Sequence, residues 1–332
     1  MSDTRRPVAL PTAADLAAAR DVVLSTLAPT PLISAPAAGE SVFLKLESFQ
    51  PTGSFKVRGA LAACAAFPAG SRIVTASAGN HGLGIAWAAT RRGLRATIVV
   101  AETASPAKRE ALARMPVELI LHGTSVDAAE FHAMALAADP AQPMPYISPY
   151  NDPHVIAGQS TLADEIVAQV PGDNGRPLTI IAAVGGGGLV AGLSLRAAEL
   201  STPERPIRVI GVEAAESTAL SAAIVAGDTV EVRIGDTIAD GIAGNLEPGA
   251  ITAGIIGAHH VRLLTAAEAD IHGTIRWLAR NHGLVAEGAG ATPLAALLAG
   301  DAGTVEGDVV VVISGRNIAL PKLAAILADA DA

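Results

Sequence analysis

KLESFQPTGSFKVRGA, residues 45–60, is the stretch that decides the fold and the chemistry of this 332-residue chain. A strand-like run over residues 43–47 leads into a Pro-Thr-Gly turn, and an apolar helix then begins with Lys56 in its first turn. A charged lysine entering a buried helix loses much of its hydration energy unless it is paired or neutralised. A Schiff base would neutralise Lys56 covalently, although most lysines in such a position are simply solvated at the surface.

Outward from this stretch, short β-branched runs alternate with helical segments. This alternation is typical of parallel sheets whose strands are connected by helices. The predicted strands are residues 43–47, 72–77, 96–101, 117–121, 179–184, 207–212, 260–264 and 308–313. The predicted helices are residues 12–27, 82–92, 105–115, 126–138, 155–170, 189–200, 218–226, 266–281 and 291–299. The pattern predicts an α/β protein with two parallel-sheet, three-layer domains. Residues 1–50 and 148–332 form the large domain, and residues 51–147 form a small inserted α/β domain.

The composition excludes several classes of function. The formal charge is −9 and no cluster of lysine and arginine stands out, which argues against a nucleic-acid or membrane partner. The single cysteine, Cys64, lies in an apolar run where burial is expected, and it allows no disulfide within the chain. With no visible signal peptide, a cytoplasmic location is predicted. Residues 178–195 are uncharged for long enough to suggest a membrane helix, but four consecutive glycines favour a strand and a turn.

A second motif, SAGNHGLG at residues 77–84, joins a predicted strand to a predicted helix. Its small residues let backbone amides approach a ligand, and the start of a helix attracts a carboxylate. A glycine-rich turn capped by Ser77 or Asn80 is the purely structural alternative.

A third motif, GGGG at residues 185–188, lies between a strand and a helix. Successive amides in such a loop make an anion site that the helix dipole strengthens. The loop alone leaves two interpretations open. It could hold a cofactor phosphate, or Gly186-x-Gly188-x-x-Ala191 could be a dinucleotide fingerprint with Glu213 on the ribose.

Together with SGRN at residues 314–317, these motifs resemble, in order, those of the serine/threonine dehydratase family. Its members are fold type II pyridoxal-phosphate enzymes with the tryptophan synthase beta-like architecture. A nicotinamide enzyme has no use for SFKVRGA or SAGNH, so the resemblance favours pyridoxal 5′-phosphate over a dinucleotide. Weaker matches are DGIA at residues 240–243 and EGAGA at residues 287–291.

The resemblance implies a role for each motif residue. Lys56 would be the Schiff-base residue, and Phe55 would lie against the cofactor ring. Asn80 would hydrogen-bond the phenolic oxygen, and the hydroxyl of Ser314 would bond the ring nitrogen and leave it neutral. The phosphate would be held by Gly185, Gly186, Gly187 and Gly188. The substrate's α-carboxylate would be bound within the segment Ser77, Ala78, Gly79, Asn80 and His81.

The implied reaction is β-elimination of a hydroxy amino acid, L-threonine or L-serine, to a 2-oxo acid and ammonia, with Lys56 as the general base. Racemases of the family have a serine at the position of Ala78, and alanine has no exchangeable side-chain proton, so racemisation is less favoured. A nicotinamide oxidoreductase is the alternative from another class.

Two departures from the family pattern leave the substrate open. Arg316 stands where the family has glycine, and Ser148-Pro-Tyr-Asn stands where many dehydratases have His-Pro-Phe-Asp. A 3-hydroxyaspartate or an aryl-serine is therefore an alternative substrate. Glu213 is followed six residues later by Ala219 instead of the family's aspartate, so no divalent metal is expected. The resemblance also implies a homodimer.

Overall fold

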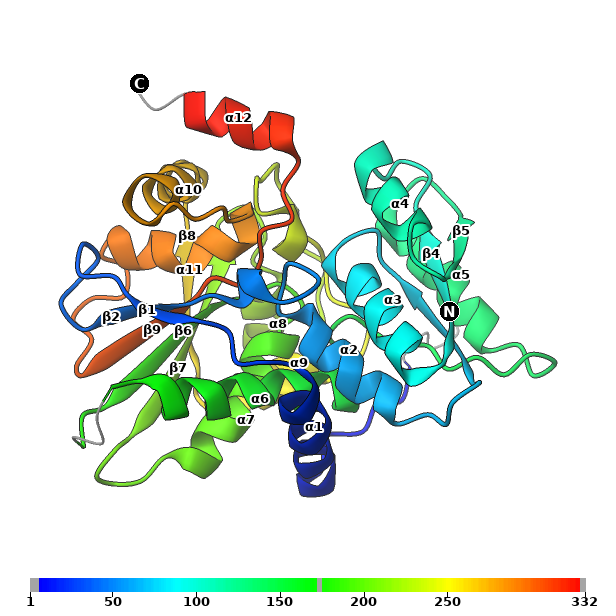
Figure 1. Cartoon of the computed structure of the whole chain (residues 1–332), viewed down its shortest axis with the longest axis horizontal. Coiled ribbons are helices and arrows are strands. Elements are labelled where there is room, and N and C mark those ends of the chain that lie inside the picture. Colours follow the sequence, from blue (N-terminus) through cyan, green and yellow to red (C-terminus); the bar gives the residue numbers. More distant parts are fainter. Residues whose placement is uncertain (1–5, 172–174, 329–332) are drawn as a thin grey trace.

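The computed structural model describes residues 6–171 and 175–328, which form two separate β-sheets (Figure 1). The larger sheet has six strands in the order β1-β2-β9-β6-β7-β8. These strands are β1 (Leu32–Ser34), β2 (Val42–Lys45), β9 (Asp308–Val312), β6 (Leu178–Ala183), β7 (Ile207–Ala214) and β8 (Arg262–Ala266). Every neighbouring pair is parallel except β1 with β2.

Strand β9 shows that the larger sheet is covered on both faces. Val309 and Val311 belong to one apolar core, whereas Val310 and Val312 belong to the core on the opposite face. Successive side chains point to opposite faces of a strand, and burying each valine contributes about 1.5–3 kcal/mol. The first face is covered by α10 (Glu268–His282), α11 (Gly288–Leu298) and α12 (Leu320–Ala328). The second is covered by α6 (Pro153–Gln169), α7 (Gly188–Leu200), α8 (Ala219–Ala226) and α9 (Ile251–Ala258).

The smaller sheet is parallel throughout and has the order β3-β4-β5. Its strands are β3 (Arg72–Ala76), β4 (Arg95–Val100) and β5 (Glu118–Leu121). Helix α5 (Val126–Ala137) packs on one face, and α3 (Asn80–Arg92) and α4 (Pro106–Ala113) pack on the other. The predicted pair of layered parallel sheets is thus confirmed, while the division of the chain at residues 50 and 147 stays a prediction.

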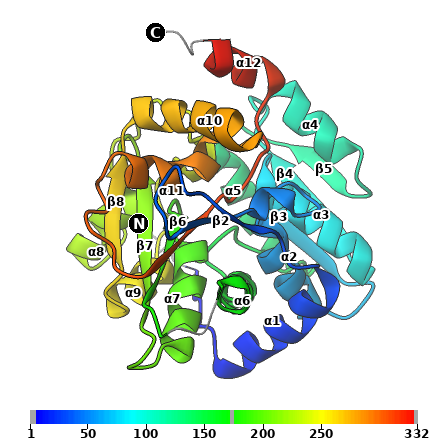
Figure 2. The same cartoon turned by 60° about the vertical axis from the view of Figure 1, so that its left-hand side comes forward.

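Helix α2 (Lys56–Ala65), which begins at the motif lysine, packs between the two layered units (Figure 2). It shares one apolar core with α1 (Ala13–Thr26), α3 and α6, to which it contributes Val57, Leu61 and Cys64. The predicted burial of Cys64 is confirmed. The first turn of α2 touches α3, since a Cβ on Gly84 would lie 3.3 Å from the carbonyl of Lys56.

The predicted strands lie within two residues of the observed ones, but four details were wrong. Helix α9 was missed because its sequence, ITAGIIGA, combines glycines and β-branched residues of low helix propensity. His259 and His260, expected to begin a strand, instead end α9, and His260 has a φ of 51°. Strand β1 was missed because it has only three residues. Helix α11 begins at Gly288, three residues earlier than predicted.

Residues 178–195 do not form one helix. They form β6, the glycine loop and the first part of α7, as the four glycines indicated. Within the described residues, no helix has both the length and the apolar character needed to span a bilayer.

Candidate active site

Three of the sequence motifs meet at one edge of the larger sheet. Strands β2, β9 and β6 are parallel neighbours, so the segments that follow them lie side by side. Lys56 follows β2 after the short 3-10 helix η1 (Glu47–Phe49), Ser314 follows β9, and the loop 185–188 follows β6. The amide of Phe55 donates to the carbonyl of Ser314 at 3.0 Å. Parallel α/β sheets bind ligands at this carboxyl edge.

The amine of Lys56 lies in a half-buried position. Its Nζ donates to the carbonyl of Pro149 at 2.8 Å and lies 5.3 Å from the ring centroid of Phe55. Burial lowers the pKa of Lys56 to about 8, although the carboxylate of Glu287 opposes this shift. At pH 7 about a tenth of the amine is therefore neutral, far more than for an ordinary lysine.

The glycine loop presents backbone amides and leaves no room for side chains. A Cβ on Gly186 would lie 2.3 Å from the ring of Tyr150, and one on Gly185 would lie 2.8 Å from Cα of Ile242. Gly187 has a φ of +84°, which favours glycine. No amide from residue 185 to residue 189 donates to another described residue, and the start of α7 has no side-chain cap. This arrangement suits an anion.

Ser314 provides a second group without a partner beside the loop. The residue is 3% exposed, and its hydroxyl makes no hydrogen bond within the described part of the chain. The oxygen itself is not fully enclosed by the protein. The hydroxyl is therefore available to a ligand that enters between Lys56 and the glycine loop.

Asn80 connects the loop after β3 to the larger sheet. Its Nδ2 donates to Oε1 of Glu287 at 2.7 Å, and its Oδ1 accepts from Nδ2 of Asn317 at 2.6 Å. These three residues belong to three different motifs, so the structure brings together the predicted site loops.

The other residues of the SAGNH segment lie in two environments. Ser77, Ala78 and Gly79 are half-buried in the loop, where the hydroxyl of Ser77 accepts from the amide of Gly79 at 3.2 Å. His81 is 2% exposed, and its Nε2 lies 3.3 Å from the carbonyl of Ile147. Burial lowers the pKa of His81 to about 3, and the charge of Lys56 adds to this shift. His81 is therefore neutral and faces the protein interior instead of the loop.

Sequence reasoning assigned no role to Glu287, which the structure places among the site residues. It is 6% exposed, begins α11 and accepts the hydrogen bond from Asn80. Burial raises its pKa to about 7, and the amide of Asn80 opposes this. The EGAGA motif was the only signal, and an acidic residue before a Gly/Ala helix is too common to predict its partners.

The dinucleotide interpretation of the glycine loop required Glu213 to bind a ribose. In the structure Glu213 is 1% exposed, and its carboxylate accepts from the amides of Leu220 and Ser221 at 3.0 and 3.3 Å, and from the Ser221 hydroxyl. The carboxylate therefore caps α8, and the ribose-binding alternative is wrong.

The two departures from the dehydratase pattern also have structural explanations. Arg316 is exposed and donates to the carbonyl of Ser48, with its guanidinium 5.7 Å from the ring centroid of Phe49. The hydroxyl of Ser148 and the amide of Asn151 both donate to the buried carboxylate of Glu247. Ser148 and Asn151 thus hold the loop that supplies the carbonyl bonded by Lys56.

One cavity lies away from these motifs. It has a volume of about 560 Å³ and is lined by Arg208, His259 and Arg262 among others, at the amino ends of β6, β7 and β8. A smaller cavity of about 290 Å³ includes Ser77, Ala78 and Lys108. We place the site at the carboxyl edge, because the unpaired loop amides, the Ser314 hydroxyl and the low-pKa lysine are there.

Comparison with known proteins identifies the family of the chain. The sequence profile of the family described as "Pyridoxal-phosphate dependent enzyme" matches residues 23–315. The chain is 37% identical over 284 residues to the L-threonine ammonia-lyase of Thermotoga maritima, covering 84% of this chain and 68% of that protein. It is 34% identical over 309 residues to the catabolic L-threonine dehydratase of Staphylococcus aureus, covering 90% of this chain and 86% of that protein.

A solved structure gives the same family assignment. Maize serine racemase superimposes with a TM-score of 0.85 at 26% identity, covering 96% of this chain and 97% of that one. The fold is therefore that of the fold type II enzymes, as the motifs implied. From the matched profile, the relatives and the fold, this chain belongs to the family of pyridoxal-phosphate dependent enzymes.

Proposed function

We propose that this protein catalyses the β-elimination of L-threonine or L-serine to a 2-oxo acid and ammonia. The observation that carries the proposal is a lysine of lowered pKa and a glycine loop suited to an anion at the same carboxyl edge of the larger sheet. The names of the two sequence relatives support the choice of an ammonia-lyase.

The residues present fit pyridoxal phosphate. The amides of residues 185–189, which donate to no other described residue, would hold its phosphate, the hydroxyl of Ser314 would meet its ring nitrogen, and Lys56 would hold its aldehyde carbon. Asn80 has a second amide proton for the phenolic oxygen, because one donor is engaged by Glu287. When bound, the cofactor supplies the electron sink that makes the substrate's Cα proton acidic.

Lys56 then performs the proton transfer. A general base works best when its pKa lies near the working pH, and burial brings the amine of Lys56 to about 8. The neutral amine removes the α-proton, the β-hydroxyl leaves as water, and hydrolysis of the released product gives ammonia and the 2-oxo acid. The segment from Ser77 to Asn80 orients the substrate through its α-carboxylate.

The lowered pKa of Lys56 predicts how covalent capture of the cofactor depends on pH. Only the neutral amine attacks an aldehyde, so the capture rate should rise with pH and level off above about pH 8. Mixing cofactor-free protein with pyridoxal phosphate between pH 6 and 11 and following the visible absorbance measures this profile. A rate that still rises at pH 10 would show an ordinary lysine.

A racemase is the second candidate, because maize serine racemase has a similar fold. We expect the substitution Ala78→Ser to increase racemisation of L-serine, since it supplies the proton donor that alanine lacks. A well-placed acid raises a reaction rate about 10²–10⁴-fold. Because the new serine would not be optimally placed, we expect the racemisation rate to rise by about the lower of these factors. Chiral chromatography of L-serine after incubation measures the change. Fast racemisation by the unaltered enzyme would favour the racemase.

The preferred side chain of the substrate can be tested directly. Because Arg316 is engaged with Ser48 and Phe49, we expect no preference for an acidic substrate. Release of 2-oxo acid should be fastest with L-threonine or L-serine and slower with 3-hydroxyaspartate or an aryl-serine. Exclusive turnover of an acidic substrate would contradict the proposal.

We further propose that the enzyme is a cytoplasmic homodimer, as the family resemblance implies. Light scattering coupled to size-exclusion chromatography tests the dimer, with a single species of about twice the 33.3 kDa chain mass as the expected result.

A further inference from the structure

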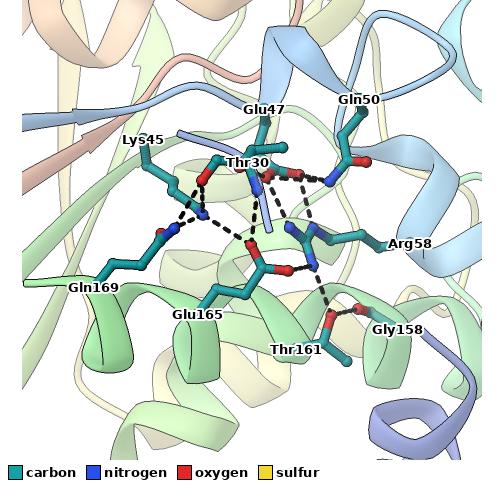
Figure 3. Close-up of polar contacts among 9 residues, drawn as sticks. All are labelled: Thr30, Lys45, Glu47, Gln50, Arg58, Gly158, Thr161, Glu165 and Gln169. Atoms are coloured by element: carbon teal, nitrogen blue, oxygen red, sulfur yellow. Dashed lines mark hydrogen bonds and ion pairs between the residues drawn. The ribbon is translucent and has the colours of Figure 1, made fainter. Parts of the chain in front are cut away.

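A buried network of charged side chains includes Arg58, which lies two residues after Lys56 on α2 (Figure 3). Arg58, Glu47, Glu165 and Lys45 form its centre, and their side chains are at most 4% exposed. Arg58 donates through Nε and Nη2 to the two oxygens of Glu47 at 2.7 and 2.8 Å. Its Nη1 donates to Oε1 of Glu165 at 2.7 Å, and Nζ of Lys45 donates to Oε2 of Glu165 at 2.8 Å. Two cations thus balance two carboxylates.

Neutral groups complete the network. The hydroxyl of Thr30 donates to Glu47 at 2.6 Å, the hydroxyl of Thr161 accepts from Arg58 at 3.2 Å, and Lys45 also donates to Gln169 at 2.7 Å. These residues come from β2, η1, α2, α6 and the loop before β1. The network therefore connects the lysine-bearing helix to the sheet edge and to α6.

Stability alone is a poor explanation for this arrangement. Buried ion pairs recover little more than the cost of their own desolvation, and apolar replacements of similar volume often stabilise a protein as well or better. What a forked guanidinium adds is geometry, because its planar donors fix both the direction and the rotation of the groups that they join.

The start of α2 needs such a constraint. The helix has no side-chain cap at its first turn. Its backbone touches α6, since a Cβ on Gly158 would lie 2.6 Å from the carbonyl oxygen of Arg58. A glycine contact fixes how closely two helices approach but does not set rotation about the helix axis. The amide of Phe55 holds the chain just before Lys56 through the carbonyl of Ser314, and the bonds from Arg58 to η1 and to α6 hold the rotation of the helix two residues after Lys56.

We propose that Arg58 is a positioning residue whose bonds to Glu47 and Glu165 orient the amine of Lys56. The inference rests on the proposed role of Lys56 in holding the cofactor and moving the α-proton. A misplacement of about 1 Å at a reacting group can lower a rate about 10²-fold. Loss of the hydrogen bonds from the Arg58 guanidinium to Glu47 and Glu165 should therefore lower kcat while the chain remains folded.

The substitution Arg58→Lys tests whether the planar guanidinium is needed, because lysine keeps the charge but offers no planar pair of donors. Arg196→Lys is a matched control. Arg196 also bonds two carboxylates, Asp164 at 2.7 Å and Glu199 at 2.5 Å, but it lies on α7 and these bonds join α7 to α6 and to itself instead of to α2. We expect kcat to fall about 10- to 100-fold in Arg58→Lys and to stay unchanged in Arg196→Lys.

A second readout needs no cofactor. The chain has four lysines, Lys45, Lys56, Lys108 and Lys322, and Arg58→Lys adds a fifth at position 58, so acetylation of each is assigned from peptide fragment masses across pH. In Arg58→Lys we expect the labelling profile of Lys56 to shift toward higher pH as the amine leaves its buried position, with Lys108 and Lys322 unchanged. Unchanged labelling of Lys56 and an unchanged kcat would overturn the proposal.

A charge-balanced variant covers the case in which Arg58→Lys fails to fold. Glu47→Leu with Arg58→Met removes one cation and one carboxylate and keeps the pair of Lys45 with Glu165. We expect it to fold, because apolar replacement of a buried pair is tolerated, but to show the same change in kcat and labelling. A folded double variant with normal kcat and labelling would also overturn the inference. Acetylation reports the surroundings of Lys56 and does not depend on the substrate. If the unaltered enzyme did not act on L-threonine or L-serine, that result would count against the proposed function, whereas the labelling result would still test the role of Arg58.

Discussion

Replacing Lys56 with alanine should reduce elimination of L-threonine or L-serine by about 10³-fold or more. The substitution removes the amine that would hold the cofactor and the base that would take the α-proton. The loss of a general base alone lowers a reaction rate about 10²–10⁴-fold. Steady-state release of 2-oxo acid, measured at saturating pyridoxal phosphate, checks this expectation.

The control for this variant is Lys322→Ala. Lys322 is an exposed lysine on α12, the last described helix of the chain, and its loss should leave the rate unchanged. A Lys56→Ala enzyme that keeps more than about a tenth of the normal rate at saturating cofactor would mean that another group moves the α-proton.

The substitution Gly186→Ala should weaken cofactor binding strongly. The new Cβ would lie 2.3 Å from the ring of Tyr150, and that ring is held because its hydroxyl accepts from the amide of Glu247 at 2.6 Å. Relief of such overpacking costs about 1–3 kcal/mol, and if the loop moves instead of the ring, its amides leave the anion site. We expect the dissociation constant for pyridoxal phosphate to rise about 10- to 100-fold, as measured by fluorescence titration of the cofactor-free protein.

Gly254→Ala is the matched control for the loop. Gly254 lies within α9, and an added Cβ there would meet nothing within 4 Å. This substitution should raise the unfolding temperature slightly, because alanine has the higher helix propensity, and it should leave cofactor binding intact. Equal cofactor affinities for Gly186→Ala and the unaltered enzyme would refute the assignment of the loop to the phosphate.

Local sequence signals predicted the fold and the position of the site motifs well. The run at residues 308–313 is apolar enough to predict a strand covered on both faces, and GGGG at residues 185–188 predicts a loop between a strand and a helix. Parallel sheets bring the ends of their strands to one edge, which explains why motifs found at strand ends meet in the structure. The family resemblance then supplied the cofactor.

Contacts between distant residues could not be predicted in this way. Asn80 and Glu287 are 207 positions apart, and Arg58 and Glu165 are 107 positions apart. A single sequence records local preferences and apolar periodicity, whereas these pairs depend on how the two layered units and α6 pack around α2. For the same reason, the sequence did not predict that His81 faces the interior or that Arg316 is engaged with η1.

The central claim is that the cofactor is held by Lys56. Reduction of the cofactor-loaded enzyme with borohydride, followed by peptide mapping, tests it most directly, because only four lysines can carry the label. The account predicts one stoichiometric label on the peptide that contains Lys56. A label on Lys45, Lys108 or Lys322 instead, with Lys56 unmodified, would contradict it.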